Sequence, residues 1–169
     1  MALLIGELEQ TIDAKHRLAI GSMFRDRINP REDGEEFILV LGPDRHLWLY
    51  PDRYYARMLA TVRRTPLPTR QQGKTRMFFG MARPLKPDAQ GRVVLPEISL
   101  QRAVISDRVT LVGCDDHIEI WPADEWGRLV QDGLSGYGEM LYETAERMAA
   151  EQGAREVRAP QTPGSPEIV

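Results

Sequence analysis

The sequence predicts an α+β fold, mainly β, built from two copies of one structural unit. A phrase at residues 13–20, D-A-K-H-R-L-A-I, recurs at residues 88–95 as D-A-Q-G-R-V-V-L. A second block at residues 42–51, G-P-D-R-H-L-W-L-Y-P, is matched at residues 113–122 by G-C-D-D-H-I-E-I-W-P. Two blocks that recur in the same order, about 75 residues apart, indicate an internal repeat. Because each unit buries only one face, we expect the two copies to pack into one pseudo-symmetric body.

The first repeat reads as two hairpins followed by a helix. The expected strands cover residues 4–12, 17–20, 37–41 and 47–50, with tight turns at 13–16 and 42–46. Residues 29–36 are polar and contain Gly and Pro, which is typical of a loop. Asp52 can cap the start of a helix that has one apolar side. Pro66 and Pro68 are expected to end this helix.

A second helix and then the second repeat follow. Residues 69–82 place Met77, Phe78 and Met81 at helical spacing. In the second repeat, residues 84–87 are expected to lead into the turn at Asp88. The elements expected after that turn are a strand at 92–95, a helix near 97–104, strands at 108–113 and 117–121, and a short helix from Asp124. We therefore divide the chain into a first repeat (1–52), connecting helices (53–83), a second repeat (84–131) and a tail (132–169).

The tail differs in composition from the repeats. Residues 133–138 hold three glycines, 139–158 are charged and helix-favouring, and 160–169 are rich in Pro, Ser and Gly. This order predicts a linker, a solvated helix and a disordered end.

Charge and cysteine content restrict the class of protein. Residues 1–86 contain 15 Lys and Arg against 10 Asp and Glu, whereas residues 87–169 contain 7 against 15. Such asymmetry can mark a nucleic-acid face on one half, although the net charge of −3 means that local arginines must carry the binding. A single cysteine, Cys114, cannot form an intramolecular disulfide, and no stretch approaches the roughly 18 apolar residues of a membrane span. We expect a cytoplasmic protein.

The repeated D-x-x-x-R turn is the strongest candidate for a functional element. Asp13 and Asp88 can each accept hydrogen bonds from backbone N–H groups two or more residues on, which would organise the loop. Arg17 and Arg92 then start the return strands, with side chains projecting from a rigid turn. The alternative is that both arginines are only ion-paired to these aspartates on the surface, at about 0–1 kcal/mol each.

The two turns differ at their fourth residue. Gly91 adopts a positive φ at little cost, whereas His16 in the first turn must accept that strain or change the turn type.

Four segments resemble the MraZ family, bacterial transcriptional regulators associated with the division and cell-wall gene cluster and built from two tandem SpoVT-AbrB repeats. They are G-E-L-E-Q-T-I-D-A-K-H-R-L-A-I at 6–20, L-W-L-Y-P at 47–51, D-A-Q-G-R-V-V-L-P at 88–96 and V-G-C-D-D-H-I-E-I-W at 112–121. The resemblance covers about residues 1–131. It implies two tandem swapped-hairpin AbrB-like β-barrel halves with short peripheral helices, ring-shaped homo-oligomers, and D-x-x-x-R loops that face DNA.

The first motif departs from the family pattern at two positions. His16 stands where the family has glycine, and Gly21 stands where the strand ends in proline; the second motif keeps Gly91 and Pro96. The first loop can therefore differ in shape or base preference. His16 also adds a titratable donor beside the basic residues.

The resemblance and the residue chemistry together predict a sequence-specific transcriptional regulator, a repressor of its own cluster promoter, that is nucleoid-associated and binds repeated short boxes. The expected DNA-binding residues are Lys15, His16, Arg17 and Arg92, and the expected loop-organising residues are Asp13, Asp88 and Gly91. Arginine pairs with guanine edges or phosphates, and a ring would add avidity. We expect no enzymatic activity, cofactor, metal or small-molecule substrate.

Two other functions have some support in the sequence. Asp115, Asp116, His117 and Glu119 could form a metal or acid–base cluster, but the corresponding first-repeat segment ending at His46 reads as a turn, and the spacing matches no zinc motif. An AbrB-like protein-interaction module of the antitoxin type would need a hydrophobic tail shaped for a partner. Residues 137–148 offer only Tyr, Met and Leu scattered among charges.

Overall fold

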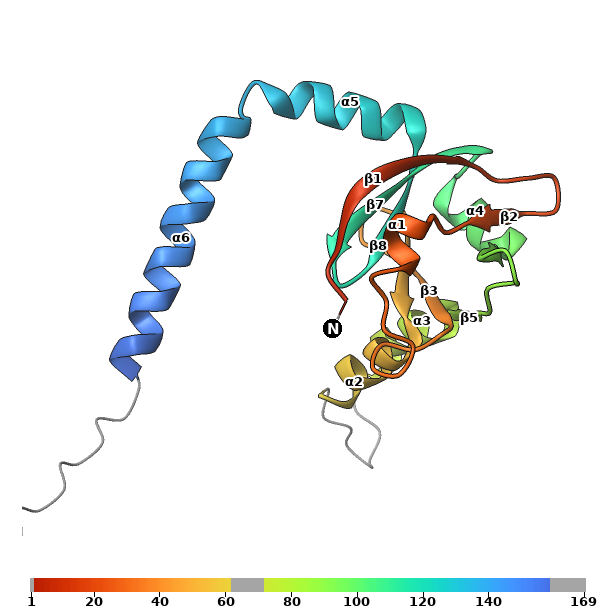
Figure 1. The fold of residues 1–169 in the computed structure, drawn as a ribbon, viewed down its shortest axis with the longest axis horizontal. Coiled ribbons are helices and arrows are strands. Elements are labelled where there is room, and N and C mark those ends of the chain that lie inside the picture. The colour runs from red at the N-terminus through yellow and green to blue at the C-terminus, as the bar shows by residue number, and fades with distance from the viewer. Residues whose placement is uncertain (1, 62–71, 159–169) are drawn as a thin grey trace, which may run out of the picture. The chain divides into compact units, whose positions relative to one another are not determined.

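A computed structural model describes residues 2–61 and 72–158 of the chain. The chain divides into two compact units, Met1–Gly127 and Arg128–Val169. Figure 1 shows the elements. In chain order they are β1 (Leu4–Thr11), β2 (Arg17–Ala19), α1 (Ser22–Arg25), β3 (Phe37–Leu41), β4 (Leu47–Pro51), α2 (Asp52–Ala60), α3 (Gln72–Met81), β5 (Arg83–Leu85), β6 (Arg92–Val94), α4 (Glu97–Ala103), β7 (Arg108–Asp115), β8 (Ile118–Pro122), α5 (Ala123–Leu134) and α6 (Tyr137–Arg158).

The strands of the first unit follow an order that is consistent with the repeated sequence. Six antiparallel strands form one sheet in the order β1-β7-β8-β4-β3-β5, and β2 pairs with β6 in a separate two-stranded ribbon. The first strand of each repeat therefore lies beside the third strand of the other repeat, β1 with β7 and β5 with β3. The order is pseudo-symmetric about the central β8–β4 pair, and the two repeats are built into one body.

The prediction that residues 4–12 and 17–20 pair with each other as a hairpin is wrong. β1 instead pairs along its whole length with β7, from Leu4 opposite Asp115 to Thr11 opposite Arg108 (Figure 1). β2 is only three residues long. An eight-residue ladder satisfies more of the backbone groups of β1 than β2 could, so the strand from the other repeat is the better partner.

The mixed α+β class with a mostly antiparallel sheet is confirmed, but the barrel halves are not. Among the residues that the structure describes, the strands close into no barrel: β1 and β5 end the sheet at opposite edges, and the ribbon strands pair with each other.

One apolar core joins the sheet, the ribbon and two short helices. It includes Leu18 and Val93 of the ribbon, Leu49 of the sheet, Phe24 of α1 and Leu100 of α4. Alternate residues of β3 and β4 point to the opposite face of the sheet. There Val40 and Tyr50 form a smaller cluster with Tyr55 of α2.

The two β-hairpins are not equivalent residue by residue. The sequence match places Gly42 with Gly113, but Leu41 pairs with Leu47 whereas Gly113 pairs with Ile118. The first turn is thus one residue longer, and Gly42 occupies the place of Cys114. A backbone hydrogen bond closes each turn, from Gly42 N to His46 O (2.8 Å) and from Cys114 N to His117 O (2.9 Å).

Several helices differ in extent from the expectation. α2 begins at Asp52 as expected, while its expected end at Pro66 and Pro68 lies outside the described residues. Residues 84 and 85, which were expected only to lead into the Asp88 turn, belong to a strand, β5, that pairs with β3. α5 runs to Leu134, through Gly133, and is longer than the short helix expected.

The second unit, Arg128–Val169, contains the end of α5 and all of α6. From residue 128 to residue 151 no side chain is buried, which agrees with a solvated helix. The end expected to be disordered, 160–169, lies outside the described residues. No helix that the structure describes is long and apolar enough to cross a membrane.

Candidate nucleic-acid interface

The ribbon brings the two D-x-x-x-R motifs onto one small surface. In its register Arg17 lies opposite Val94, Leu18 opposite Val93, and Ala19 opposite Arg92. Leu18 and Val93 are 0% exposed and point into the core. Since side chains alternate along a strand, Arg17, Ala19, Arg92 and Val94 form the other side, here called the outer ribbon face.

The outer ribbon face carries its two arginines at diagonal corners. Arg17 and Arg92 are diagonal cross-strand neighbours, a relation that separates Cα atoms by about 7–8 Å. Val94 is 57% exposed between them. The burial of Leu18 and Val93 beneath, at roughly 1.5–3 kcal/mol each, fixes the ribbon on the core. The arginines therefore stand on a rigid support.

Asp13 organises the first loop through three hydrogen bonds. Its Oδ1 accepts from the backbone N–H groups of Lys15 and Arg17, both at 2.9 Å. Its Oδ2 accepts from Nε of Arg17 at 2.6 Å. The hydrogen bond from the Arg17 backbone is the largest cause that lowers the pKa of Asp13, with a further contribution from the Arg17 side chain.

Asp88 repeats this arrangement in the second loop. Its Oδ1 accepts from the backbone N–H groups of Gln90 and Arg92, both at 2.9 Å, and its Oδ2 accepts from Nε of Arg92 at 2.8 Å. A second guanidinium nitrogen of Arg92 lies 2.7 Å from the same oxygen. The side-chain and backbone hydrogen bonds from Arg92 lower the pKa of Asp88 to about 2.

Each loop is held at the ribbon end by the other repeat. The carbonyl of His16 accepts a hydrogen bond from Leu95 N, and the carbonyl of Gly91 accepts one from Ile20 N, both at 2.9 Å. Each loop is therefore supported by a backbone hydrogen bond from the other copy of the motif.

The fourth residue of each loop has a positive φ, 57° at His16 and 74° at Gly91. The histidine thus adopts the left-handed conformation rather than changing the turn. Above Gly91 there is no room for a side chain, because an added Cβ would lie 2.6 Å from Nε of Arg25. That Nε donates to the carbonyl of Ile20 at 2.8 Å.

Both arginines are paired and yet accessible. The Arg17 and Arg92 side chains are 34% and 31% exposed, so solvent screens each ion pair and the pair adds little to stability. Nε of Arg17 donates to Asp13. The two terminal nitrogens of the Arg17 guanidinium make no hydrogen bond to any residue that the structure describes. Lys15 is exposed on the same loop.

Sequence reasoning missed two residues at this surface. Val94 was assigned only to a strand, and the pairing of β2 with β6, rather than with β1, is what places it between the arginines. Arg25 carries no motif; its place beside Gly91 depends on α1 folding back after β2.

Together these features define an internally duplicated protein in which two aspartate-held arginine loops share one ribbon. A family model described as "MraZ protein, putative antitoxin-like" matches residues 3–76 and 78–148. The chain belongs to the MraZ family.

Curated relatives match over most of their length. A protein of Herpetosiphon aurantiacus, named "Transcriptional regulator MraZ", is 34% identical over 150 residues, covering 88% of this chain and 98% of the relative. The protein of the same name from Alkaliphilus metalliredigens is 32% identical and covers 82% of this chain and 94% of its own. The Lactiplantibacillus plantarum relative, also so named, is 30% identical, with coverage of 82% and 95%.

Proposed function

We propose that this chain is a sequence-specific DNA-binding transcriptional regulator that reads DNA with the outer ribbon face and the two D-x-x-x-R loops. The relatives' names support a regulator. The observation that carries the proposal is the duplicated presentation of Arg17 and Arg92 on one ribbon, each held by an aspartate of its own loop.

The chemistry of this face suits base readout. The major groove, about 12 Å wide, admits a two-stranded β-ribbon, and an arginine fork can bind O6 and N7 of guanine. Val94, exposed between the arginines, can contact a thymine methyl group. Lys15 and His16, on the first loop, could pair with phosphates, which would add salt-dependent affinity without sequence preference.

The aspartates have two opposite effects on binding. Each one neutralises part of the charge of its arginine, which lowers attraction to phosphates. Each also fixes the Nε edge of the guanidinium, so that less side-chain entropy is lost on contact with a base. An interface of this kind gains discrimination rather than general affinity, which fits a protein with a net charge of −3.

Assembly would supply the missing affinity. A ring of chains that displays the same ribbon at regular intervals fits repeated short boxes in a promoter, because linked weak contacts multiply. Met77, Phe78 and Phe79 of α3 are exposed, and a group of large exposed apolar side chains is typical of a subunit contact. On this basis we propose a homo-oligomeric ring that represses the promoter of its own gene cluster and associates with the nucleoid.

An antitoxin-type protein-binding module is the second candidate, since the description of the family model includes the term "antitoxin-like". A partner protein bound by α6 would distinguish it from a regulator. Tyr137, Met140, Leu141 and Met148 are exposed and recur along α6 at intervals of three, four and seven residues, so this helix carries an apolar stripe on which such a partner could pack.

A gel shift with the DNA upstream of the chain's own gene, combined with light scattering, tests this proposal. We expect retardation of that DNA over an unrelated fragment of equal length, and a mass several-fold above the 19.2 kDa of one chain. Equal retardation of both fragments would remove sequence specificity, and a monomeric mass would remove the avidity argument.

A further inference from the structure

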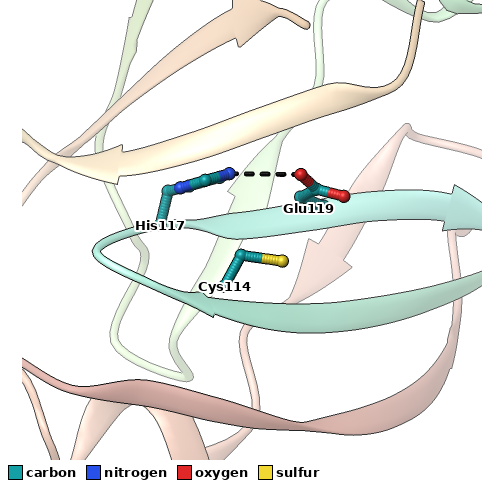
Figure 2. Close-up of side chains that lie close together, drawn as sticks. All are labelled: Cys114, His117 and Glu119. Carbon is teal, nitrogen blue, oxygen red and sulfur yellow. Dashed lines mark hydrogen bonds and ion pairs between the residues drawn. The ribbon is translucent and has the colours of Figure 1, made fainter. Parts of the chain in front are cut away.

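We propose that Cys114, His117 and Glu119 bind one divalent transition-metal ion of the zinc type at the tip of the β7–β8 hairpin. Figure 2 shows the three side chains together, with His117 and Cys114 both extending toward Glu119. One ligand atom from each, a sulfur, a ring nitrogen and a carboxylate oxygen, lies within 4.8 Å of the other two. The spacing of these residues matches no familiar zinc motif, and the hairpin pairing is what brings them together.

The distances fit metal coordination. Tetrahedral zinc with ligand bonds of about 2.0–2.1 Å to nitrogen and oxygen separates those two atoms by about 3.3 Å, and a thiolate at about 2.3 Å lies about 3.6 Å from each. His117 Nε2 and Glu119 Oε1 are 3.2 Å apart. From the 4.8 Å limit on the trio, the distance from the sulfur to either of the other two atoms needs to shorten by at most about 1.2 Å. Rotation about χ1 of Cys114 together with adjustment of the Glu119 side chain can provide this change.

Each nitrogen and oxygen ligand is already oriented by a second residue. His117 is 9% exposed, and its Nδ1 lies 2.6 Å from Oδ1 of Asp116. A carboxylate can only accept, so a proton on Nδ1 suits this contact, and Nε2, which faces Oε1 of Glu119 at 3.2 Å, is the nitrogen that would coordinate the metal. A histidine held by a carboxylate in this way is typical of metal sites. Trp121 Nε1 donates to Oε2 of Glu119 at 2.7 Å, which leaves Oε1 directed at His117.

Asp116 is in turn held by Tyr54 of α2. The Tyr54 hydroxyl donates to Oδ2 of Asp116 at 2.7 Å, and this bond is the largest cause that raises the pKa of Tyr54 to about 12. The second oxygen of the carboxylate thus remains available to His117. The chain from Tyr54 through Asp116 to His117 links the hairpin tip to a different element.

The first hairpin serves as an internal comparison. Its His46 also packs against an aromatic ring, with a centroid separation of 3.8 Å from Trp121, much as His117 packs 4.8 Å from Tyr50. The histidine therefore belongs to the repeated fold. The other two ligand positions do not, because Gly42 stands in the place of Cys114 and Trp48 in the place of Glu119.

The two hairpins also differ in the space that they leave for a side chain at the cysteine position. A Cβ at Gly42 would lie 2.5 Å from the indole of Trp48, so the first hairpin has no room for a cysteine there. The shorter Glu119 leaves that room in the second hairpin. Only the second repeat thus combines a thiol, an imidazole and a carboxylate.

The charges of the site balance a divalent cation. A thiolate and a carboxylate contribute two negative charges, and a neutral imidazole contributes none. The thiolate is the form of cysteine that binds metals, so binding would transfer the thiol proton to solvent.

The site is remote from the outer ribbon face. Asp115, beside the site, lies opposite Leu4 of β1, whereas the Asp13 loop follows Thr11 at the other end of that strand. Seven residue steps at about 3.3 Å place the two ends roughly 23 Å apart. The metal would therefore pin the hairpin tip and raise stability, and the inference does not depend on DNA binding.

Cobalt titration of the reduced, metal-free protein tests the proposal. Cys114 is the only cysteine, so any thiolate-to-cobalt charge-transfer absorption must come from it. We expect that absorption to saturate at one ion per chain, to be displaced by zinc, and to be accompanied by a higher midpoint of thermal unfolding. No charge-transfer absorption with excess cobalt would overturn the proposal.

Variants locate the site. Cys114→Ser should lose the absorption, and Asp116→Asn should weaken binding by about 10- to 100-fold through the orientation of His117. Asp44→Asn, in the turn of the first hairpin, is the matched control and should bind cobalt like the wild type. Equal zinc affinity of wild type and Cys114→Ser would contradict the proposal. If Cys114→Ser does not fold, the rate of Cys114 modification by a thiol reagent in the wild type decides, because a bound zinc must slow it and an unchanged rate refutes the site.

Discussion

Replacing Gly91 with alanine should destabilise the protein through the shape of one loop. The residue has φ of 74°, and its absent Cβ would meet the Arg25 guanidinium at 2.6–2.8 Å. An L-residue in the left-handed region costs about 1–2 kcal/mol. Displacing Arg25 from the carbonyl of Ile20 adds about 1 kcal/mol, and the lower entropy of the unfolded chain offsets about 0.4–1 kcal/mol. We expect a net loss of about 1–2.6 kcal/mol.

His16→Ala is the matched control for this experiment. His16 already has a Cβ at φ of 57°, so alanine there adds no backbone strain, and the free energy of unfolding should change by no more than about 0.5 kcal/mol. Urea unfolding followed by circular dichroism measures both variants. If Gly91→Ala is as stable as the wild type, or if both variants lose the same amount, the strain and the clash with Arg25 assigned to a side chain at position 91 are wrong.

Two other predictions follow from the same geometry. Because the pKa of Asp88 is lowered in the folded protein, its contribution to stability is present above about pH 4 and is lost as the pH falls toward 2. In Asp88→Asn, the free energy of unfolding should therefore depend less steeply on pH between pH 4 and pH 2. A slope equal to that of the wild type would contradict this prediction. Phe78→Ser on exposed α3 should lower the oligomer mass in light scattering if that surface is a subunit contact, and an unchanged mass would exclude it.

The sequence predicted the local elements well because each carries its own signal. Turn residues and apolar alternation placed β3, β4 and β8 within a residue of their observed bounds. The Asp13 and Asp88 turns were expected from the reach of a short carboxylate to nearby N–H groups, and those hydrogen bonds are present.

Strand partners could not be predicted in the same way, because pairing across repeats leaves no local trace. Nothing near residues 4–12 indicates that β7 is the neighbour of β1. The one-residue difference between the hairpins was hidden for the same reason, since both blocks are ten residues long and begin with glycine. That difference placed Cys114 beside His117 and Glu119, a cluster that spacing alone did not predict.

The proposal that the arginines read DNA is tested most directly by measuring the affinity of Arg17→Ala and Arg92→Ala for the upstream promoter DNA. Fluorescence anisotropy at several salt concentrations should show each variant weakened by about 1–3 kcal/mol, roughly 5- to 150-fold. Arg17→Ala should lose more, because Lys15 shares its loop and because Arg92 commits two guanidinium nitrogens to Asp88. Arg53→Ala on α2 removes the same charge away from the ribbon and should bind like the wild type. Wild-type affinity in both ribbon variants, or an equal loss in Arg53→Ala, would contradict DNA recognition by this face.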